Sequence, residues 1–400
     1  MSKVYVIGTC DTKGDELRFA CDCARRAGAK AILVDVSTSM PDKRADVTAE
    51  AVAGRHPKGR AAVLGLTDRG QAVSAMAEAL KRYLLSRRDI GAVLGLGGGG
   101  NTAIVTEAMR ALPVGLPKIM VSTLASGNVA SFVGPTDITM MHAVTDIAGL
   151  NSISRSVIGN AAHAAAGMAL TRVPKARKSK RAIGYTMFGV TTACVNEIRR
   201  RLEPACESFV FHATGTGGQC FEKLAESGFF DGVFDITTTE VADYLVGGVL
   251  PCTADRFGAI IRNPIPYVGS VGACDMVNFG PRDTVPTRFA ARKFHIHNAH
   301  VTLMRTTPEE NAKIGAFIVE RLNRMAGPVR FLLPLKGISG IDAEGQPFHD
   351  PAADAALFGA IRKGWKRAKN HKLIELDLHI NDPAFAEAAM AAFQSISRRR

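Results

Sequence analysis

Short apolar runs alternate with amphipathic stretches along the chain. Near the N-terminus this alternation predicts a strand, a helix and a strand at 4–8, 15–28 and 31–35. The second half repeats the order at 181–185, 193–203 and 209–212. A buried strand, a helix of that length and a second strand form a βαβ unit. The chain therefore contains at least two such units, placed at the start of each half.

The similarity between the halves continues downstream. The first half has apolar strands at 90–94 and 119–122, with an amphipathic helix over 102–112 between them. In the second half, the segment 235–240 corresponds in order to the stretch 95–101, and the segment 266–270 corresponds to the strand at 119–122. Continuous apolar strands are typical of parallel sheets covered on both faces. We therefore expect two related Rossmann-like α/β domains, 1–178 and 179–400, with mostly parallel sheets, helices on both faces and a ligand cleft between them.

Other segments are less directly tied to the repeat. A small-residue helix over 152–168 suits a domain or subunit interface, and a basic run at 175–181 suits a linker. The C-terminal part predicts a helix opening at Pro308, then further elements at 331–335 (strand), 354–367 (helix), 373–376 (strand) and 383–395 (helix).

Composition narrows the class of protein. The net charge of +13 suggests nucleic acid as a partner, but the charge is spread along helices and aromatic residues are only 6%. Nucleic-acid binding is therefore not the favoured interpretation. The apolar runs are too short to cross a bilayer, the N-terminus has no signal-peptide pattern, and the eight cysteines lack metal-site spacing. We expect a cytoplasmic protein with reduced thiols and no membrane partner.

The strongest chemical signal is the glycine-rich stretch 95–101 between a strand and a helix. Glycines let backbone N–H groups approach an anion, and a helix N-terminus adds partial positive charge. Asn101 and Thr102 can cap the helix and touch the same ligand. The candidate cofactor-binding residues here are Gly97, Gly98, Gly99, Gly100, Asn101 and Thr102. The alternative is that the glycines serve only tight packing.

Two further loops of the first half carry polar side chains. The loop 9–14 contains Asp11, Thr12 and Lys13, where Lys13 suits a phosphate and Asp11 a ribose hydroxyl or a Mg²⁺-bound water. It is not a Walker loop, because its lysine precedes the glycine. Asp35 ends the second strand, where an acidic residue contacts ribose hydroxyls in dinucleotide-binding folds. The alternative for 9–14 is a capped turn.

The third loop follows the strand at 119–122. Its hydroxyl-bearing and small residues could form a polar nest for a carboxylate or phosphate. The residues concerned are Ser122, Thr123, Ser126, Gly127 and Asn128. The alternative is an ordinary turn rich in serine and threonine.

Candidate catalytic residues lie in the second half. The loop 212–218 begins with His212 and again resembles an anion cradle. Arg256 lies in a later loop, and His297 would share one face of a strand with His295. His212 or His297 could act as a general base. His295, His297 and His300 cluster, but hydrogen-bonded or surface histidines are the simpler interpretation, so no metal site is predicted.

Four segments together resemble one family: GTCDTKGDEL at 8–17, GLGGGGNT at 95–102, VSTLASGNVASFVGPTDI at 121–138 and HNAHVTLMRTTPEEN at 297–311. This largely uncharacterised family includes the ATP-binding inhibitory domain of the tomato mosaic virus resistance protein. The resemblance covers essentially the whole chain. It implies two Rossmann-like subdomains, ATP bound by the first and a homodimer. Asn101 departs from the Gly-Gly of many relatives. A barrel-like domain fused in plant and fungal relatives is absent here, which implies a separate protein partner.

Three functional hypotheses follow. The first is an enzyme that uses ATP, with Mg²⁺, on a small acidic metabolite bound between the domains. The second is a non-catalytic ATP-dependent module that binds or inhibits another protein. The third is an enzyme for a small phosphorylated metabolite that needs no nucleotide.

Overall fold

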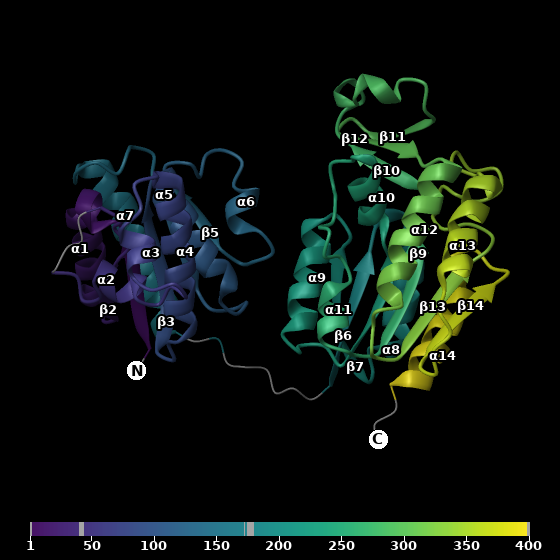
Figure 1. Cartoon of the computed structure of the whole chain (residues 1–400), viewed down its shortest axis with the longest axis horizontal. Helices are drawn as coiled ribbons and strands as arrows, with labels where there is room; N and C mark the ends of the chain where they lie inside the picture. Colours follow the sequence, from purple (N-terminus) through teal and green to yellow (C-terminus); the bar gives the residue numbers. More distant parts are fainter. Residues whose placement is uncertain (1, 40–43, 172, 174–179, 398–400) are drawn as a thin grey trace. The chain divides into compact units, whose positions relative to one another are not determined.

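The computed structural model describes residues 2–39, 44–171, 173 and 180–397. The chain divides into two compact units, Met1–Ala176 and Arg177–Arg400 (Figure 1). Each unit is described separately below. Most of the predicted linker, 175–179, lies outside the described residues.

The N-terminal unit is built on one parallel sheet of five strands in the order β2-β1-β3-β4-β5. Its strands are β1 (Lys3–Gly8), β2 (Lys30–Asp35), β3 (Ile90–Gly97), β4 (Lys118–Ser122) and β5 (Thr139–His142). The strands are buried along most of their length because helices cover both faces of the sheet. This confirms the predicted α/β class.

Helices α1 (Cys10–Arg26) and α7 (Ser152–Leu170) pack on one face of this sheet. The other face is covered by α2 (Ala49–Ala53), α3 (Ala61–Leu64), α4 (Arg69–Leu85) and α5 (Gly99–Ala111). A short helix, α6 (Ala130–Val133), lies in the connection between β4 and β5. Alanine and glycine dominate the buried positions of α7, which lets it approach the strands closely.

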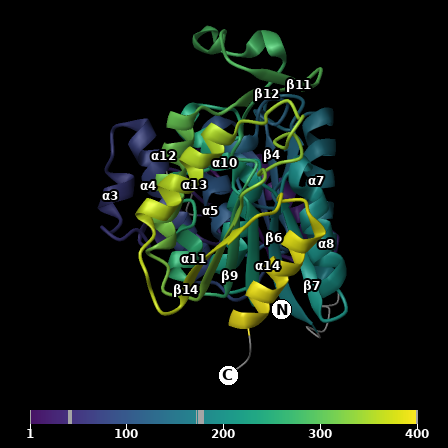
Figure 2. The same cartoon turned by 90° about the vertical axis from the view of Figure 1, so that its right-hand side faces the viewer.

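The C-terminal unit has a parallel sheet of six strands in the order β14-β13-β9-β8-β6-β7. The strands are β6 (Arg181–Met187), β7 (Cys206–His212), β8 (Gly232–Thr237), β9 (Tyr267–Gly272), β13 (Val329–Pro334) and β14 (His371–Leu376). Helices α8 (Thr192–Leu202) and α14 (Pro383–Ile396) share one face, as Figure 2 shows. The opposite face carries α9 (Thr216–Glu226), α10 (Thr239–Val246), α11 (Gly258–Arg262), α12 (Pro308–Leu322) and α13 (Pro351–Gly364).

An antiparallel sheet of three strands, absent from the sequence prediction, extends the C-terminal unit. It consists of β10 (Met276–Phe279), β12 (Val301–Arg305) and β11 (Phe294–Asn298), in that order. Gly280 and Pro281 directly follow β10. The described part of the N-terminal unit has no such sheet.

The two parallel sheets share their strand order. In each unit the first strand lies between the second and the third, and the fourth and fifth follow outward. This doubly wound order places a switch point between the first and third strands, and ligands of such folds bind beyond the carboxyl ends of the strands there. The switch point of the N-terminal unit lies between β1 and β3.

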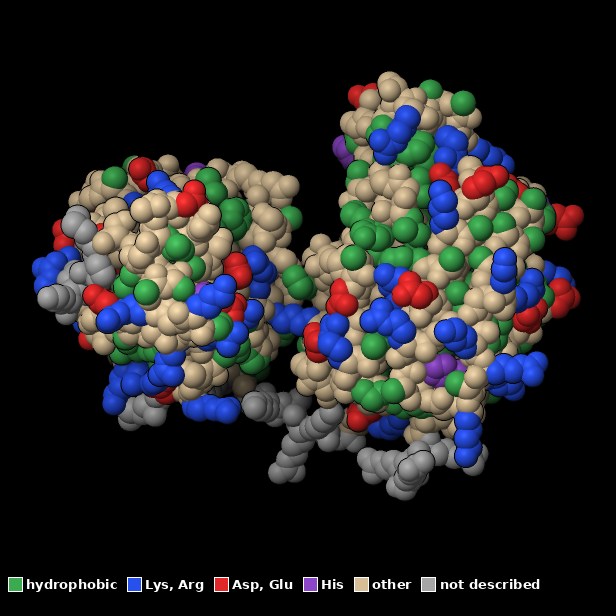
Figure 3. All heavy atoms as spheres, viewed as in Figure 1, with side chains coloured by type: hydrophobic (Ala, Val, Ile, Leu, Met, Phe, Trp, Pro, Cys, Tyr) green, Lys and Arg blue, Asp and Glu red, His purple; other side chains and the backbone are tan. Residues whose placement is uncertain are grey.

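No described helix is long and apolar enough to cross a membrane. On the face drawn in Figure 3, Lys and Arg side chains are scattered among Asp and Glu side chains instead of gathering in one patch. The excess of positive charge therefore has no single focus on that face.

Candidate functional site

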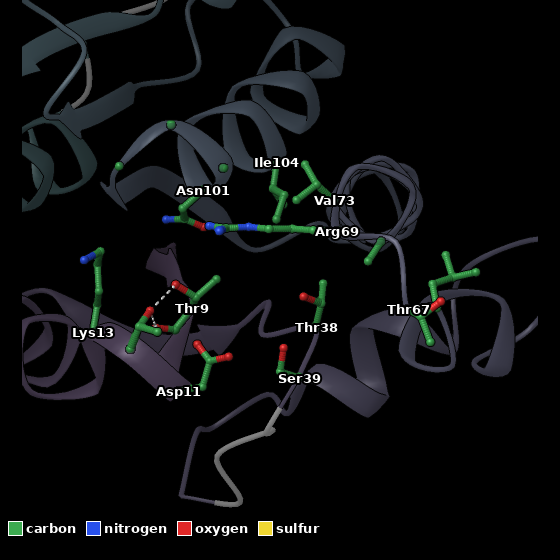
Figure 4. Close-up of a pocket in the computed structure, with 16 residues that line it drawn as sticks. Thr9, Asp11, Lys13, Thr38, Ser39, Thr67, Arg69, Val73, Asn101 and Ile104 are labelled. Atoms are coloured by element: carbon green, nitrogen blue, oxygen red, sulfur yellow. Dashed lines mark hydrogen bonds between the residues drawn. The ribbon is translucent and has the colours of Figure 1, made fainter.

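A cavity of about 520 Å³ opens at the switch point of the N-terminal unit. Its walls come from the start of α1, from the first turn of α5, from the start of α4 and from the segment after β2 (Figure 4). Of the predicted cofactor-binding residues, seven line it: Asp11, Thr12, Lys13, Gly98, Gly99, Gly100 and Asn101. The structure thus brings two loops together that are far apart in the sequence.

Most of the glycine-rich stretch 95–101 belongs to a strand and a helix, and its loop is shorter than the sequence predicted. Strand β3 runs to Gly97 and helix α5 begins at Gly99, so only Gly98 separates them. Gly98 has no side chain with which to cap the helix, and the N–H of Thr102 is the first to bond back, to the Gly98 carbonyl oxygen at 2.9 Å. The N–H groups of the preceding turn therefore stand at the cavity without intrahelical acceptors.

The glycines of this stretch divide into two kinds. A Cβ atom on Gly95 would lie 2.5 Å from Sδ of Met120, and one on Gly97 would lie 2.6 Å from Cβ of Asn101, so both positions require glycine for packing. On Gly98 and Gly99 the nearest atoms would be 3.7 and 3.5 Å away, which is ordinary contact. Packing within the protein does not require glycine at those two positions, which line the cavity.

Asn101 and Thr102 lie inside α5 and are buried, so neither caps the helix as expected. Nδ2 of Asn101 donates to the Leu96 carbonyl oxygen, while its Oδ1 has no partner in the described part of the chain. The Thr102 hydroxyl lies 2.7 Å from that of Ser122 and 2.8 Å from the Gly98 carbonyl oxygen. Thr102 and Ser122 therefore join α5 to β4 and do not line the cavity.

Helix α1 starts at Cys10, five residues before the predicted start, and kinks at Lys13. The Asp11 N–H donates to Oγ of Ser37 at 3.1 Å, whereas Oδ1 of Asp11 is buried without a partner among the described residues. The Lys13 ammonium donates to the Ile147 carbonyl oxygen. This loop therefore combines fixed backbone with a carboxylate and an ammonium at the cavity.

Asp35 does not line the cavity. It is fully buried, and its Oδ1 accepts from the Cys10 N–H at 3.0 Å and from the N–H and hydroxyl of Ser37 at 2.9 and 2.5 Å. The carboxylate thus holds the β1–α1 loop from inside the protein. The predicted ribose contact of Asp35 finds no support in this placement.

The third predicted loop also lies off the cavity. Ser126, Gly127 and Asn128 are exposed, and Oδ1 of Asn128 accepts from the Ala130 N–H at 3.0 Å, which caps the turn before α6. Thr123 is nearer, because its hydroxyl lies 3.7 Å from the place of a Cβ on Gly98. The polar-turn alternative therefore describes 126–128 better than the nest does.

Sequence reasoning missed several cavity residues, above all Arg69. It is the first residue of α4, whose N-cap Asp68 accepts from the Gln71 N–H at 2.7 Å. Thr67-Asp68 before an amphipathic stretch is a capping signal that could have placed Arg69 at a helix start. The other missed residues are Thr38, Ser39, Leu66, Thr67, Ala72, Val73 and Ile104.

In the C-terminal unit the predicted anion cradle at 212–218 is filled by the protein itself. A Cβ on Gly217 would lie 1.8 Å from the His212 carbonyl oxygen, and one on Gly218 would lie 2.0 Å from Oε1 of Glu240. Oε2 of Glu240 accepts from the Gly215 N–H at 2.9 Å. These glycines therefore allow tight packing against a carboxylate, and the cradle interpretation is wrong.

Arg256 lies in the interior and pairs with acidic side chains. Its guanidinium is 2.5 Å from Oε1 of Glu240, 2.7 Å from Oδ1 of Asp235 and 3.8 Å from Oε1 of Glu222. Burial raises the pKa of Glu240 and raises that of Glu222 to about 7. Arg256 is 1% exposed, so it balances buried carboxylates and is not placed to contact a substrate.

The two candidate histidines lie on different elements. His212 ends β7 and is exposed, with its ring 5.4 Å from that of Phe188, whereas His297 is exposed on β11 of the antiparallel sheet. Within the described residues, no hydrogen bond or ion pair joins either histidine to Arg256, and no group of His, Cys, Asp and Glu could hold a metal alone. Their catalytic roles stay predictions.

Comparison with known proteins places both halves of the chain in one family. Residues 2–174 match the N-terminal domain and residues 180–397 the C-terminal domain of the Uncharacterised protein family (UPF0261). A UPF0261 protein of Rhizobium meliloti is 55% identical to this chain, over 99% of this chain and the whole of the relative. A UPF0261 protein of Mesorhizobium japonicum is 56% identical, over 100% of both chains.

A plant relative has a longer chain. The ToMV resistance protein Tm-1(GCR237) of Solanum lycopersicum is 43% identical over 420 residues, which cover 99% of this chain and 56% of the tomato protein. The resemblance inferred from the four sequence segments is thereby confirmed. The chain belongs to the uncharacterised protein family UPF0261.

Proposed function

We propose that the N-terminal domain binds ATP, together with Mg²⁺, with its phosphates at the N-terminus of α5. The observation that carries this proposal is the first turn of α5, which opens without a cap onto a cavity where Gly98 and Gly99 leave room for a ligand. Free N–H groups and the helix dipole favour an anion at that point.

The charges and the walls of the cavity suit a nucleotide. Lys13 and Arg69 approach the first turn of α5 from opposite sides of the view in Figure 4 and provide positive charge for phosphates. Leu66, Val73 and Ile104 supply apolar wall for a base. A volume of about 520 Å³ lies within the range of small-molecule sites.

The second candidate is a non-catalytic module whose binding to another protein depends on ATP. It is favoured by the placement of His212, His297 and Arg256, which no hydrogen bond or ion pair connects within the described residues. The name of the tomato relative describes resistance to a virus, which fits such a role for that protein. The cytoplasmic location and the homodimer stay predictions.

Calorimetric titration of the purified chain with ATP and Mg²⁺ tests the proposal. We expect saturable binding that weakens at least about tenfold in Lys13→Ala and in Gly98→Val, because each removes charge or space from the phosphate site. Equal affinity for ribose 5-phosphate and ATP would instead favour a phosphorylated metabolite. If wild type does not bind ATP at millimolar concentration, the proposal fails.

Chromatography of the nucleotide distinguishes the two candidate functions. ATP incubated with the protein and a pool of small acidic metabolites is consumed by an enzyme and stays intact with a binding module. The same incubation with Gly98→Val serves as the control for contaminating ATPases.

A further inference from the structure

Two oxygen atoms on the cavity wall have no donor among the described residues: Oδ1 of Asp11 and Oδ1 of Asn101. Asn101 is only 6% exposed, and its Nδ2 is held by the Leu96 carbonyl oxygen, which fixes the amide oxygen on the other side. In Figure 4 the Asp11 carboxylate points from the start of α1 into the cavity. A buried acceptor without a donor is costly, so both oxygens are placed to receive a donor or a cation that a ligand brings into the cavity.

A bare polyphosphate cannot supply that partner. Phosphate oxygens are acceptors, and negative charge bound at the N-terminus of α5 would be repelled by the Asp11 carboxylate across the same cavity. A divalent cation removes both difficulties, because it attracts the carboxylate and the phosphates together. Mg²⁺ is bound in proteins by one or two carboxylates plus substrate phosphates, and it keeps several of its waters.

The rest of the cavity fits this arrangement. No group of three or more His, Cys, Asp or Glu side chains could hold a metal alone in the parts that the structure describes, so the ion would need phosphate oxygens to complete its ligands. A water of the hydrated ion is a donor of the kind that the amide oxygen of Asn101 lacks.

We propose that Asp11 holds the divalent cation that accompanies the phosphates, and that the Asn101 amide oxygen accepts from a water of that ion. This inference rests on the proposed function of the cavity. It makes Asp11 a metal-binding residue and makes the metal complex, not the free polyphosphate, the species that the site recognises. Asp11 then selects against metal-free anions.

The test compares wild type with Asp11→Asn, using inorganic tripolyphosphate as the probe because it has neither ribose nor base. Its affinity is measured by calorimetry with Mg²⁺ and in EDTA. Tripolyphosphate binds Mg²⁺ to the same extent whichever protein is present, so the difference in the Mg²⁺ effect between the proteins isolates Asp11. Asp15→Asn, an exposed residue of the same helix, is the charge-matched control, and Asp11→Ser replaces Asp11→Asn if thermal unfolding shows that the latter is misfolded.

We expect Mg²⁺ to raise the affinity of wild type and of Asp15→Asn about tenfold, and that of Asp11→Asn less than about twofold. In EDTA, Asp11→Asn should bind tripolyphosphate more tightly than wild type does, because the variant lacks the carboxylate that repels the metal-free anion. An equal Mg²⁺ effect in all three proteins overturns the inference. So does a loss of ATP affinity in Asp11→Asn with tripolyphosphate unaffected, which would assign Asp11 to the ribose.

The failure of the proposed function gives a different result. In that case wild type binds neither ATP nor tripolyphosphate, with or without Mg²⁺. Wild type that binds both, with the same affinity in Mg²⁺ and in EDTA, leaves the ATP site in place and overturns only the role of Asp11.

Discussion

Nη2 of Arg69 lies 3.8 Å from the position that a Cβ atom on Gly100 would take. The first residue of α4 thus extends to the first turn of α5, where two neighbouring helices meet. The Arg69 guanidinium makes no hydrogen bond or ion pair with another residue that the structure describes. A cation that no described residue pairs with, at an uncapped helix N-terminus, is placed to receive an anion.

Arg69→Ala should therefore weaken ATP binding about tenfold, a typical effect of losing one charge-assisted contact. Calorimetry measures the change. The control is Arg82→Ala, which removes the same charge from the other end of α4, where Arg82 pairs with Glu78 at 2.7 Å. Equal affinities of the two variants would contradict a role for Arg69.

The two kinds of glycine predict opposite phenotypes for the same substitution. Gly95→Val should lower the free energy of unfolding by about 1–3 kcal/mol or more, because its Cβ would meet Met120 and Val105 at 2.5 and 2.8 Å. Gly98→Val should fold normally and lose ATP affinity, since its side chain enters the cavity. Thermal unfolding and calorimetry on both variants check this, and a destabilised Gly98→Val would show that this glycine also serves packing.

Arg256 is expected to determine stability and not binding. Arg256→Met leaves three carboxylates without their cation in the interior, a change that costs about 3–5 kcal/mol when a buried pair is broken. Trp365 is the single tryptophan and lies in the C-terminal unit, so its fluorescence reports the unfolding of that unit. A folded Arg256→Met with unchanged stability would revive the catalytic interpretation of this residue.

The raised pKa of Glu222 predicts how stability changes with pH. Burial raises it from 4.5 to about 7, so the folded state holds a proton that the unfolded state releases. The resulting stability is complete below about pH 4.5 and is lost as pH rises through about 7. Urea unfolding, followed by Trp365 fluorescence at pH 5 and pH 8, measures the free energy of unfolding. We expect it to fall between these pH values in wild type, and to fall by about 1–2 kcal/mol less in Glu222→Gln.

Other groups in the C-terminal unit also titrate, so the pH effect of Glu222 is obtained by comparing wild type with Glu222→Gln. Asp235, Glu240 and Arg256 surround Glu222, and Asp243, Asp275 and Asp354 elsewhere in the unit also have raised pKa values. Both proteins share those groups, so only the difference between them belongs to Glu222. Identical pH profiles of wild type and Glu222→Gln would contradict the assignment.

The α/β architecture was predictable because apolar strands and amphipathic helices alternate with regular spacing. The two halves of the sequence repeat the same order of strands and helices, and they fold into parallel sheets with the same strand order. The antiparallel sheet β10-β12-β11 was not predicted as a sheet, because its strands are short; only a strand carrying His295 and His297 was expected there.

The cavity was predictable only in part. Gly98 and Asp11 could be predicted from their residue types and from their positions after a strand. Sequence could not separate Gly98 from Gly95, because the distinction depends on Met120, which comes from the neighbouring strand. Nor could it show that Asp35 and Arg256 are buried with partners, since those partners, Ser37 and Glu240 among them, are brought in by the fold.

The most direct test of the account is a crystal structure of the chain with Mg²⁺ and a non-hydrolysable ATP analogue. The account predicts phosphate density at the N–H groups of the first turn of α5, between Lys13 and Arg69, with the metal beside Asp11. Nucleotide density elsewhere, with the Gly98–Asn101 turn facing only solvent, would contradict it.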